Sequence, residues 1–366
     1  MSSQAFCASC GTPLAPHQAF CTQCGTPVGE IGADAPGAPE PCRSCGSSLL
    51  PGSIFCPECG AGRSREIGKG EGWSELRLRL ESETRGEFQI LEEIGSGAMG
   101  AVYRAREQSL ERLVAVKVLF PHLLADETIL RRFYNEAKIV AALRHPGIVN
   151  IITVRNVDDL HFFVMDHVNG ASLRQVLRAR GPLSIPMVKE IAYQAGSALA
   201  YAHRHGDGVI HRDVKPGNIM LDREGRALVM DFGLSKGVGA NKGMTARGAA
   251  VGTPEYMSPE QSLGRELTPA SDQYSLGVVV YTLLTGRPPF QGGAFAVLIA
   301  HTNDEPPSLR ELRPDCPDDL ARVVERMMAK EPTDRWPDIR EGIRAFGGRP
   351  SEPGDAVRRE VADLIP

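Results

Sequence analysis

Apolar residues form two kinds of pattern along the middle of the chain: short continuous runs and a spacing of three or four residues. The apolar, partly β-branched runs LVAVKVLF (residues 113–120) and FFVM (162–165) predict strands. A helix is predicted over 126–144, where Asp126 is a suitable N-cap and apolar residues follow every three or four positions: Ile129, Phe133, Ala137, Val140 and Leu143. Helical patterns return at 187–205, 273–286 and 319–330. Strands first and helices second predict an α+β domain of two lobes.

Two shorter helical patterns lie before and after this two-lobed region. WSELRLRLES (residues 73–82) places Trp73, Leu76 and Leu80 at helical spacing, and the final VRREVADLIP suggests a short helical tail. The longest apolar run, Leu276–Leu284, is far shorter than the roughly 20 residues of a membrane-spanning helix. The beginning, MSSQAFC, lacks the charged-then-apolar order of a secretory signal. No membrane span and a cytoplasmic location are therefore expected.

An internal repeat holds eight of the nine cysteines. Residues 6–25 and 41–60 each contain Cys-x2-Cys, ten residues, and a second Cys-x2-Cys, a spacing typical of four-thiolate zinc sites. Four thiolates leave no open coordination position, so two structural Zn²⁺ ions are expected. Disulfides are the alternative, disfavoured without an export signal, and redox-sensing thiols are a second one. The two ligand sets are Cys7, Cys10, Cys21 and Cys24, then Cys42, Cys45, Cys56 and Cys59.

The acidic composition of the N-terminal region bears on the role of these cysteine repeats. The whole chain carries a net charge of −4 with 23% charged residues, which is ordinary for a globular protein. Residues 1–62 contain one basic residue, Arg43, against four acidic ones: Glu30, Asp34, Glu40 and Glu58. Such a surface is poorly suited to phosphates, so no nucleic-acid partner is expected. A regulatory or protein-binding role for the repeats is the better hypothesis.

Residues suited to binding phosphate come first in the two-lobed region. The run IGSGAMGAV (Ile94–Val102) contains Gly95, Gly97 and Gly100, which allow backbone N–H groups to approach phosphate oxygens. Lys117 lies in the strand AVKVL, where an ammonium can neutralise nucleotide phosphates once a carboxylate orients it. Glu136 on the predicted helix is the natural partner. Each signal alone is weak, because hairpin turns and solvated charges are common.

The segment HRDVKPGNIML (His211–Leu221) carries the strongest signal. Asp213 can accept the proton of an attacking hydroxyl, Lys215 can lie near the transferred phosphoryl group, and Asn218 offers an oxygen to a metal ion. Asp231, in DFG, offers a second oxygen ligand of the kind Mg²⁺ prefers. A charged turn is the simple alternative, but the ordered combination with the glycine loop and Lys117 disfavours it.

Together these motifs resemble the protein kinase family, in the form of bacterial eukaryotic-like (Hanks-type) serine/threonine kinases. The resemblance covers about residues 88–346 through GSGAMGAV, AVKVL, HRDVKPGNIML, DFG, GTPEYMSPE, DQYSLG and DRW. It implies a bilobal fold, with a β-rich N-lobe and an α-rich C-lobe, and an ATP- and Mg²⁺-dependent enzyme acting on protein Ser/Thr hydroxyls. Catalytic roles fall on Asp213, Lys215 and Asn218, with Mg²⁺ on Asn218 and Asp231. The nucleotide would contact Ile94, Gly95, Gly97, Gly100, Val102, Ala115, Lys117, Glu136, Met165, Asp166, Val168, Met220 and Asp231.

The resemblance implies several supporting contacts as well. Thr253 should lie near Asp213 and Lys215, Glu260 should pair with Arg335, and Asp272 should brace the catalytic loop. Ser258 stands where many kinases have alanine. The segment between Asp231 and Glu260 is rich in Gly and Ala, and Thr245 within it is the predicted autophosphorylation site, with a plain solvated loop residue as the alternative.

The cysteine segments resemble paired zinc-ribbon modules, which completes the predicted organisation. It comprises ribbon 1 (1–28), a linker (29–40), ribbon 2 (41–62), a linker with a short helix (63–87), a kinase domain (88–346) and a tail (347–366). A non-enzymatic scaffold and a nucleic-acid-binding protein are the competing classes. The filled catalytic set disfavours the first, and the acidic N-terminal region disfavours the second.

Overall fold

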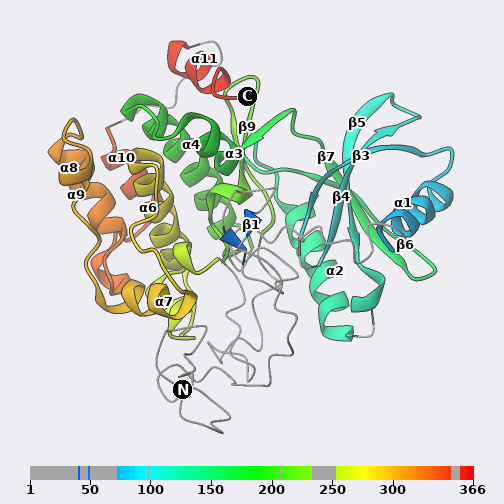
Figure 1. Ribbon diagram of the computed structural model, residues 1–366, viewed down its shortest axis with the longest axis horizontal. Helices are drawn as coiled ribbons and strands as arrows, with labels where there is room; N and C mark the ends of the chain where they lie inside the picture. Colours follow the sequence, from blue (N-terminus) through cyan, green and yellow to red (C-terminus); the bar gives the residue numbers. More distant parts are fainter. Residues whose placement is uncertain are drawn as a thin grey trace, which may run out of the picture.

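The computed structural model describes residues 40–41, 48–49, 72–97, 99–124, 126–206, 208–232, 253–347 and 355–366. These residues form a β-rich lobe followed by a helical lobe, as predicted (Figure 1). All eight predicted zinc ligands lie outside the described residues. Of the two repeats, the structure describes strands β1 (Glu40–Pro41) and β2 (Ser48–Leu49), which pair antiparallel.

The N-lobe is built on an antiparallel sheet. Within the described ranges it has five strands in the order β3-β4-β5-β7-β6. Predicted strands 113–120 and 162–165 are confirmed as β5 and β7. The bounds are β3 Phe88–Ser96, β4 Gly100–Glu107, β5 Arg112–Leu119, β6 Ile151–Val157 and β7 Leu160–Asp166.

Helix α2 (Glu127–Ala142) packs on the inner face of this sheet, toward the C-lobe. Its predicted N-cap is confirmed, since the Asp126 carboxylate accepts hydrogen bonds from the backbone N–H of Thr128 (2.8 Å) and Ile129 (3.4 Å). Alternate residues of β5, including Ala115 and Leu119, point to this side and share a core with α2. By the same alternation, Lys117 lies on this inner face.

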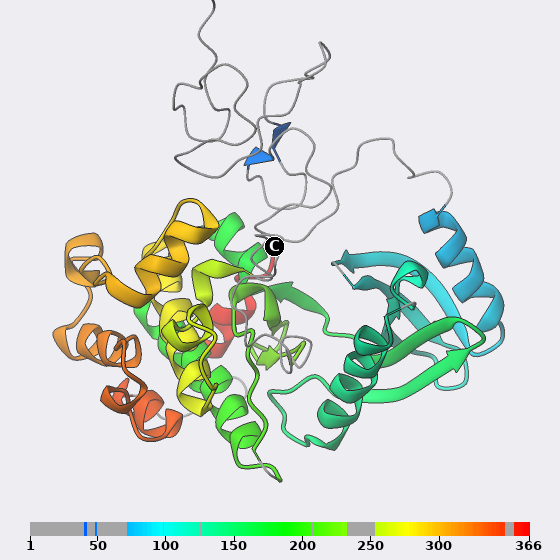
Figure 2. The ribbon, with the colours of Figure 1, turned by 90° about the horizontal axis from the view of Figure 1, so that it is seen from below.

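Helix α1 (Gly72–Glu83) covers the outer face of the same sheet, opposite α2 (Figure 2). The predicted helical spacing is confirmed: Leu76 and Leu80 are 3% and 0% exposed and join Val116 of β5 and Phe162 of β7 in one apolar core. Arg79 also pairs with Asp159 in the turn between β6 and β7. Helix α1, which falls in the predicted linker, thus packs as part of the N-lobe.

The packing of α1 predicts a sharp contrast between two leucines on one helix. Leu80→Ala removes a fully buried side chain and should lower the free energy of unfolding by about 2–5 kcal/mol. Leu78 is 63% exposed, so Leu78→Ala should change it by less than about 0.5 kcal/mol. Urea denaturation of both variants measures the difference. Equal effects would mean that α1 does not belong to the N-lobe core.

The C-lobe is mainly helical and is organised around α4 and α6. Nearly every residue of α6 is buried, so this helix forms the centre of the lobe. A small antiparallel sheet of β8 (Gly170–Ser172), β9 (Ile219–Asp222) and β10 (Ala227–Val229) faces the N-lobe. The predicted helices at 187–205, 273–286 and 319–330 are confirmed as α4, α6 and α9. The bounds are α3 Leu173–Arg180, α4 Ile185–His203, α5 Pro259–Ser262, α6 Pro269–Thr285, α7 Ala294–Asn303, α8 Leu309–Leu312, α9 Asp318–Met327 and α10 Ile339–Ala345.

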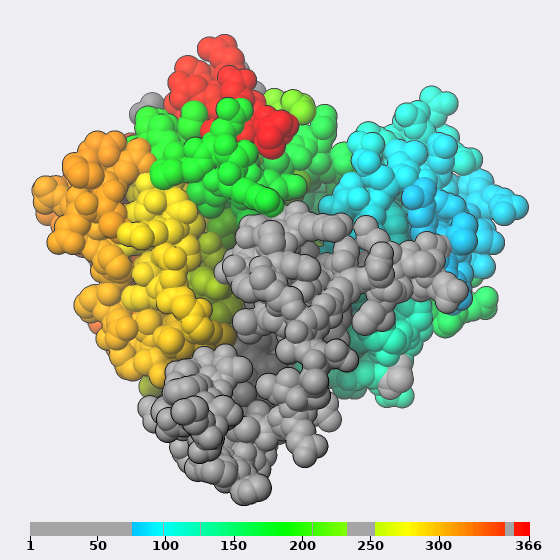
Figure 3. Space-filling view, in the orientation of Figure 1, coloured from blue at the N-terminus to red at the C-terminus, as the bar shows by residue number. Residues whose placement is uncertain are grey.

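The predicted helical tail is confirmed as α11 (Ala356–Ala362), which packs against α4 (Figure 3). Val361 is fully buried, and Arg358 pairs with the buried Glu190 of α4 at 3.3 Å. Gly225 passes so close to this helix that a Cβ would lie 2.1 Å from the Arg358 carbonyl oxygen. The tail is therefore part of the C-lobe core. Among the described helices, none is long and apolar enough to cross a membrane.

Candidate active site

The glycine-rich segment forms a hairpin between β3 and β4. Gly95 lies opposite Val102 in the register, and the Gly97 N–H donates to the Gly100 carbonyl at 2.9 Å. Gly100 is required by close packing, since a Cβ there would lie 1.9 Å from the carbonyl oxygen of Val118. Ile94 is 47% exposed at the end of β3. The hairpin thus carries Ile94, Gly95, Gly97, Gly100 and Val102 along one edge of the site.

Lys117 lies between two carboxylates on the inner face of the sheet. Its Nζ is 2.8 Å from Asp231 Oδ1 and 3.4 Å from Glu136 Oε1. The predicted partner Glu136 is therefore present, but the shorter contact is to Asp231. Burial alone would lower the pKa of Lys117, yet the two carboxylates outweigh burial and raise that pKa above its ordinary value. Lys117 is held in its charged form.

An apolar surface lies beside this charged cluster. Ala115 faces Met165 across the β5–β7 pair, and both are buried. Val102 lies opposite Lys117 on β4, so it borders the same area. Met220 lies on β9, on the side of the C-lobe. The residues predicted to contact the adenine ring therefore come from both lobes, and Asp166 and Val168 lie at and just after the end of β7, where the chain passes between the lobes.

The catalytic-loop residues form one polar cluster. Lys215 Nζ lies 2.8 Å from Asp213 Oδ2 and donates to Thr253 Oγ1 at 3.2 Å. The side-chain amide of Asn218 donates to the backbone carbonyl of Asp213 at 2.9 Å and to its Oδ2 at 3.0 Å. The predicted proximity of Thr253 is thereby confirmed. The Asp213 carboxylate is thus held within hydrogen-bond distance of one ammonium and one amide.

Asp272 of α6 binds the backbone of this loop through its carboxylate. Its carboxylate accepts the backbone N–H of His211 at 2.7 Å and of Arg212 at 2.8 Å, and it contacts His203 Nε2 at 2.7 Å. Burial alone would raise the pKa of Asp272, but the His203 hydrogen bond and the other donors outweigh burial and lower it. The predicted bracing role of Asp272 is consistent with this geometry.

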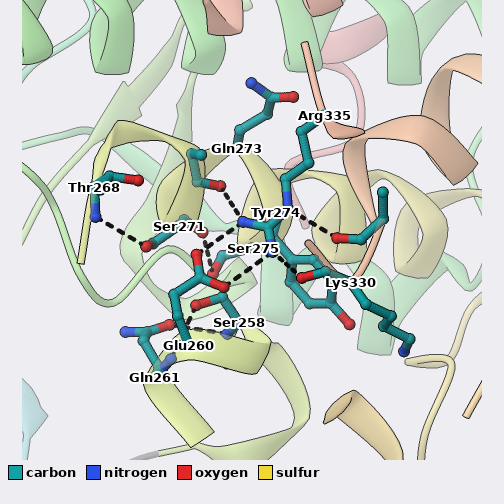
Figure 4. Close-up of polar contacts among 12 residues, drawn as sticks. Ser258, Glu260, Gln261, Thr268, Ser271, Gln273, Tyr274, Ser275, Lys330 and Arg335 are labelled. Atoms are coloured by element: carbon teal, nitrogen blue, oxygen red, sulfur yellow. Dashed lines mark hydrogen bonds and ion pairs between the residues drawn. The ribbon is translucent and has the colours of Figure 1, made fainter. Parts of the chain in front are cut away.

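Glu260 and Arg335 form a buried ion pair (Figure 4). The two guanidinium nitrogens lie 2.8 and 2.9 Å from the two carboxylate oxygens, and the side chains are 0% and 3% exposed. Burial alone would raise the pKa of Glu260, but the Arg335 hydrogen bonds and charge keep it lowered. The predicted pairing is confirmed, and it fixes α5 to the body of the C-lobe.

One predicted residue, Thr245, and one residue that the sequence did not single out, Gln261, remain to be placed. Thr245, the predicted phosphorylation site, lies outside the described residues. Gln261 was not predicted, although its amide nitrogen donates to the Arg212 carbonyl at 2.7 Å. In the sequence, SPEQ reads as a local helix cap, with no signal for a partner 49 residues away.

Comparison with known proteins decides the family. A protein kinase domain model matches residues 88–342, which is well over half of the chain. The chain belongs to the protein kinase family. A double zinc ribbon model matches residues 7–60. The predicted combination of kinase domain and N-terminal double zinc ribbon is therefore confirmed.

Named bacterial kinases are among its relatives. Serine/threonine-protein kinase PrkC of Bacillus subtilis is 37% identical over 252 residues, covering 69% of this chain and 38% of that protein. Serine/threonine-protein kinase PknA of Mycobacterium tuberculosis is 38% identical over 280 residues, covering 73% of this chain and 63% of that protein. The chain thus spans 38% and 63% of the lengths of these two relatives. The crystal structure of the Mycobacterium tuberculosis PknI kinase domain matches with a TM-score of 0.57 at 30% identity, covering 72% of this chain and 96% of that one.

A kinase domain implies ATP and Mg²⁺, and the residues present fit that ion. Both side-chain hydrogen bonds from Asn218 to Asp213 use its amide nitrogen, so the amide oxygen is the atom that Asn218 could offer to a metal ion. Asp231 adds one carboxylate. Within the described ranges no group of three or more His, Cys, Asp or Glu residues could hold a metal by itself. An ion on two oxygen ligands completed by phosphate and water is the usual Mg²⁺ arrangement.

Proposed function

We propose that this chain is an ATP- and Mg²⁺-dependent protein kinase that transfers the γ-phosphoryl group of ATP to Ser and Thr hydroxyls. The observation that carries the proposal is the catalytic-loop cluster, in which Asp213, Lys215 and Thr253 are joined by contacts of 2.8 and 3.2 Å. The Asn218 carbonyl in this cluster accepts the Met230 N–H at 3.0 Å, and the next residue, Asp231, contacts Lys117 Nζ at 2.8 Å. The fold thus brings the proposed proton acceptor, Asp213, and the proposed phosphate-binding cation, Lys117, into one site.

Each residue has a role that its chemistry supports. Asp213 accepts the proton of the substrate hydroxyl as that oxygen attacks the γ-phosphorus, and ADP leaves with the electrons of the broken bond. Lys215 places positive charge near the transferred group. Asn218 and Asp231 would hold Mg²⁺, which when bound neutralises charge on the phosphate oxygens.

The remaining site residues would bind the nucleotide. Lys117 contacts the α- and β-phosphates, oriented by Glu136 and backed by its raised pKa, which keeps it cationic. The hairpin that carries Gly95, Gly97 and Gly100 would cover the phosphates. The adenine ring packs between Val102 and Ala115 on one side and Met220 on the other, with Ile94 and Met165 at the borders. Backbone groups of Asp166–Val168 hydrogen-bond the base.

The acceptor class can be tested directly with matched peptides. Three peptides that differ only in Ser, Thr or Tyr at one position are incubated with the full chain, ATP and Mg²⁺. We expect phosphate on the Ser and Thr peptides and a rate at least about tenfold lower on the Tyr peptide. Transfer to Tyr at a rate equal to Ser and Thr would refute the acceptor class, and transfer to none would refute the kinase proposal.

The double zinc ribbon is proposed to be a regulatory or protein-binding module. Its acidic composition, with Arg43 as the one basic residue in 1–62, supports a protein partner over nucleic acid. Thiolate zinc sites persist where cysteines stay reduced, and ATP is available in the same compartment, so we place the activity in the cytoplasm.

Zinc content provides a separate prediction. The reduced 366-residue chain should hold two Zn²⁺ ions, and replacing Cys42 and Cys45 with serine should remove one of them. Cys316→Ser is the matched control, because this cysteine is buried in the C-lobe and should leave both ions bound. Elemental analysis gives the count. Absence of zinc from reduced protein would contradict the ligand assignment.

A further inference from the structure

Gln261 makes a contact that helix capping does not require. Helix α5 begins with a capping box, in which Ser258 Oγ accepts the Gln261 N–H at 3.3 Å and Gln261 Oε1 accepts the Ser258 N–H at 3.0 Å. A capping box uses only the side-chain oxygen at this position, so glutamate would serve equally well. Here the amide nitrogen also donates to the Arg212 carbonyl at 2.7 Å. The nitrogen contact joins α5 to the loop that carries Asp213.

The Arg212 carbonyl belongs to the peptide unit that leads into Asp213. The N–H of the same unit donates to His211 Nδ1 at 3.2 Å, and His211 Nε2 contacts the Met230 carbonyl at 3.0 Å. Because a peptide unit is planar, bonding both its oxygen and its N–H fixes the orientation of the whole unit. That orientation sets the direction in which the Asp213 side chain leaves the backbone.

Arg212 itself adopts a backbone conformation that needs support. Its φ is 68°, in the left-handed region that residues other than glycine rarely occupy. Such a conformation persists where neighbouring groups hold it in place. Asp272 binds the Arg212 N–H at 2.8 Å, and Gln261 binds its carbonyl. Loss of the Gln261 contact would remove the donor on the Arg212 carbonyl and leave the N–H groups of Arg212 and Asp213 as the bonded ends.

Gln261 is a rigid support because α5 is firmly anchored. The preceding residue, Glu260, is locked in the buried ion pair with Arg335, and Figure 4 shows Gln261 and Ser258 beside that pair. Helix α5 also follows the segment that starts at Thr253, whose hydroxyl contacts Lys215. The Gln261 side chain therefore links the start of α5, which the neighbouring Glu260 anchors, to the catalytic loop.

We propose that Gln261 is a positioning residue for phosphoryl transfer: its amide N–H, bonded to the Arg212 carbonyl, holds Asp213 in the orientation that accepts the substrate proton. This inference rests on the proposed kinase activity, because positioning matters only if Asp213 acts as the base. Gln261 touches neither nucleotide nor acceptor in this role. Its loss should therefore lower turnover without weakening ATP binding.

Two substitutions and one control separate positioning from helix capping. Gln261→Glu keeps the oxygen that caps α5 but replaces the donor with a carboxylate, and Gln261→Met removes both bonds without adding charge. Both should lower kcat about tenfold or more while KM for ATP stays within about twofold. Ser258→Ala removes the hydroxyl cap from the same helix end and should leave kcat within about twofold of wild type.

Amide hydrogen exchange adds a readout that does not depend on activity. Exchange in the backbone segment 211–216 should be faster in both Gln261 variants than in wild type, and unchanged in Ser258→Ala. Unchanged exchange in the Gln261 variants, an unchanged kcat in either of them, or an equal loss of kcat in Ser258→Ala would overturn the inference. An inactive wild type would instead refute the proposed function, while the exchange comparison would still test the contact.

Discussion

Asp213→Asn should reduce kcat about 10²–10⁴-fold while leaving ATP affinity nearly unchanged. Asparagine has the size of aspartate but cannot accept a proton from a hydroxyl near neutral pH. The nucleotide site is built from other residues, chiefly Lys117 and the glycine hairpin, so the variant should still bind ATP. Single-turnover kinetics and a fluorescent nucleotide titration measure the two quantities separately.

The matched control for this variant is Asp318→Asn. Asp318 is 62% exposed, pairs with Arg310 on the surface, and lies at the start of α9, away from the catalytic loop. It should retain wild-type kcat. If Asp213→Asn retained wild-type turnover, the base would be misassigned, and a parallel loss of ATP affinity would place Asp213 in nucleotide binding.

Arg335→Ala should destabilise the protein by about 3–5 kcal/mol, because it leaves the buried Glu260 carboxylate without its cation. The same guanidinium donates to the backbone carbonyls of Ala270, Ala329 and Lys330, at distances of 2.8 to 2.9 Å. Those carbonyls lose their donor in the variant as well. The free energy of unfolding from urea denaturation is the measurement.

Two controls test whether the loss in Arg335→Ala comes from an unpaired buried charge: a variant of a surface ion pair and a double variant of the buried pair. Arg310→Ala removes a partner from a pair whose side chains are 59% and 62% exposed, and should change stability by less than about 1 kcal/mol. Replacing both Arg335 and Glu260 with apolar residues should cost less than Arg335→Ala alone, since no buried charge remains. Equal losses for Arg335→Ala and Arg310→Ala would contradict the structural importance of the buried pair.

Local patterns allowed most elements and site residues to be predicted from sequence. The helix after Asp126 and strands β5 and β7 follow from the spacing of apolar residues, which reflects which side chains face the core. Asp213, Lys215 and Asn218 lie within six consecutive residues, so their proximity is a local property of one loop. Glu260 with Arg335 could be expected only through the family resemblance, because 75 residues separate them.

Contacts that depend on tertiary packing were harder to anticipate. The spacing of Leu76 and Leu80 predicts a helix but not which surface covers it, and the structure places both on the outer face of the N-lobe sheet. Lys117 lies closer to Asp231 than to Glu136, a distance set by how the lobes meet. Gln261 is the clearest case, because its capping role is local whereas its bond to Arg212 appears only when α5 and the catalytic loop are folded together.

Transfer of labelled phosphate is the most direct measurement of the proposed activity. The purified 366-residue chain and its Asp213→Asn variant are incubated with Mg²⁺ and ATP labelled at the γ-phosphate, and the modified residues are mapped by mass spectrometry. We expect label on Ser and Thr residues of the wild-type chain or an added protein, with Thr245 among the modified residues, and almost none with the variant. No transfer by the wild-type protein, or equal transfer by both, would contradict this expectation.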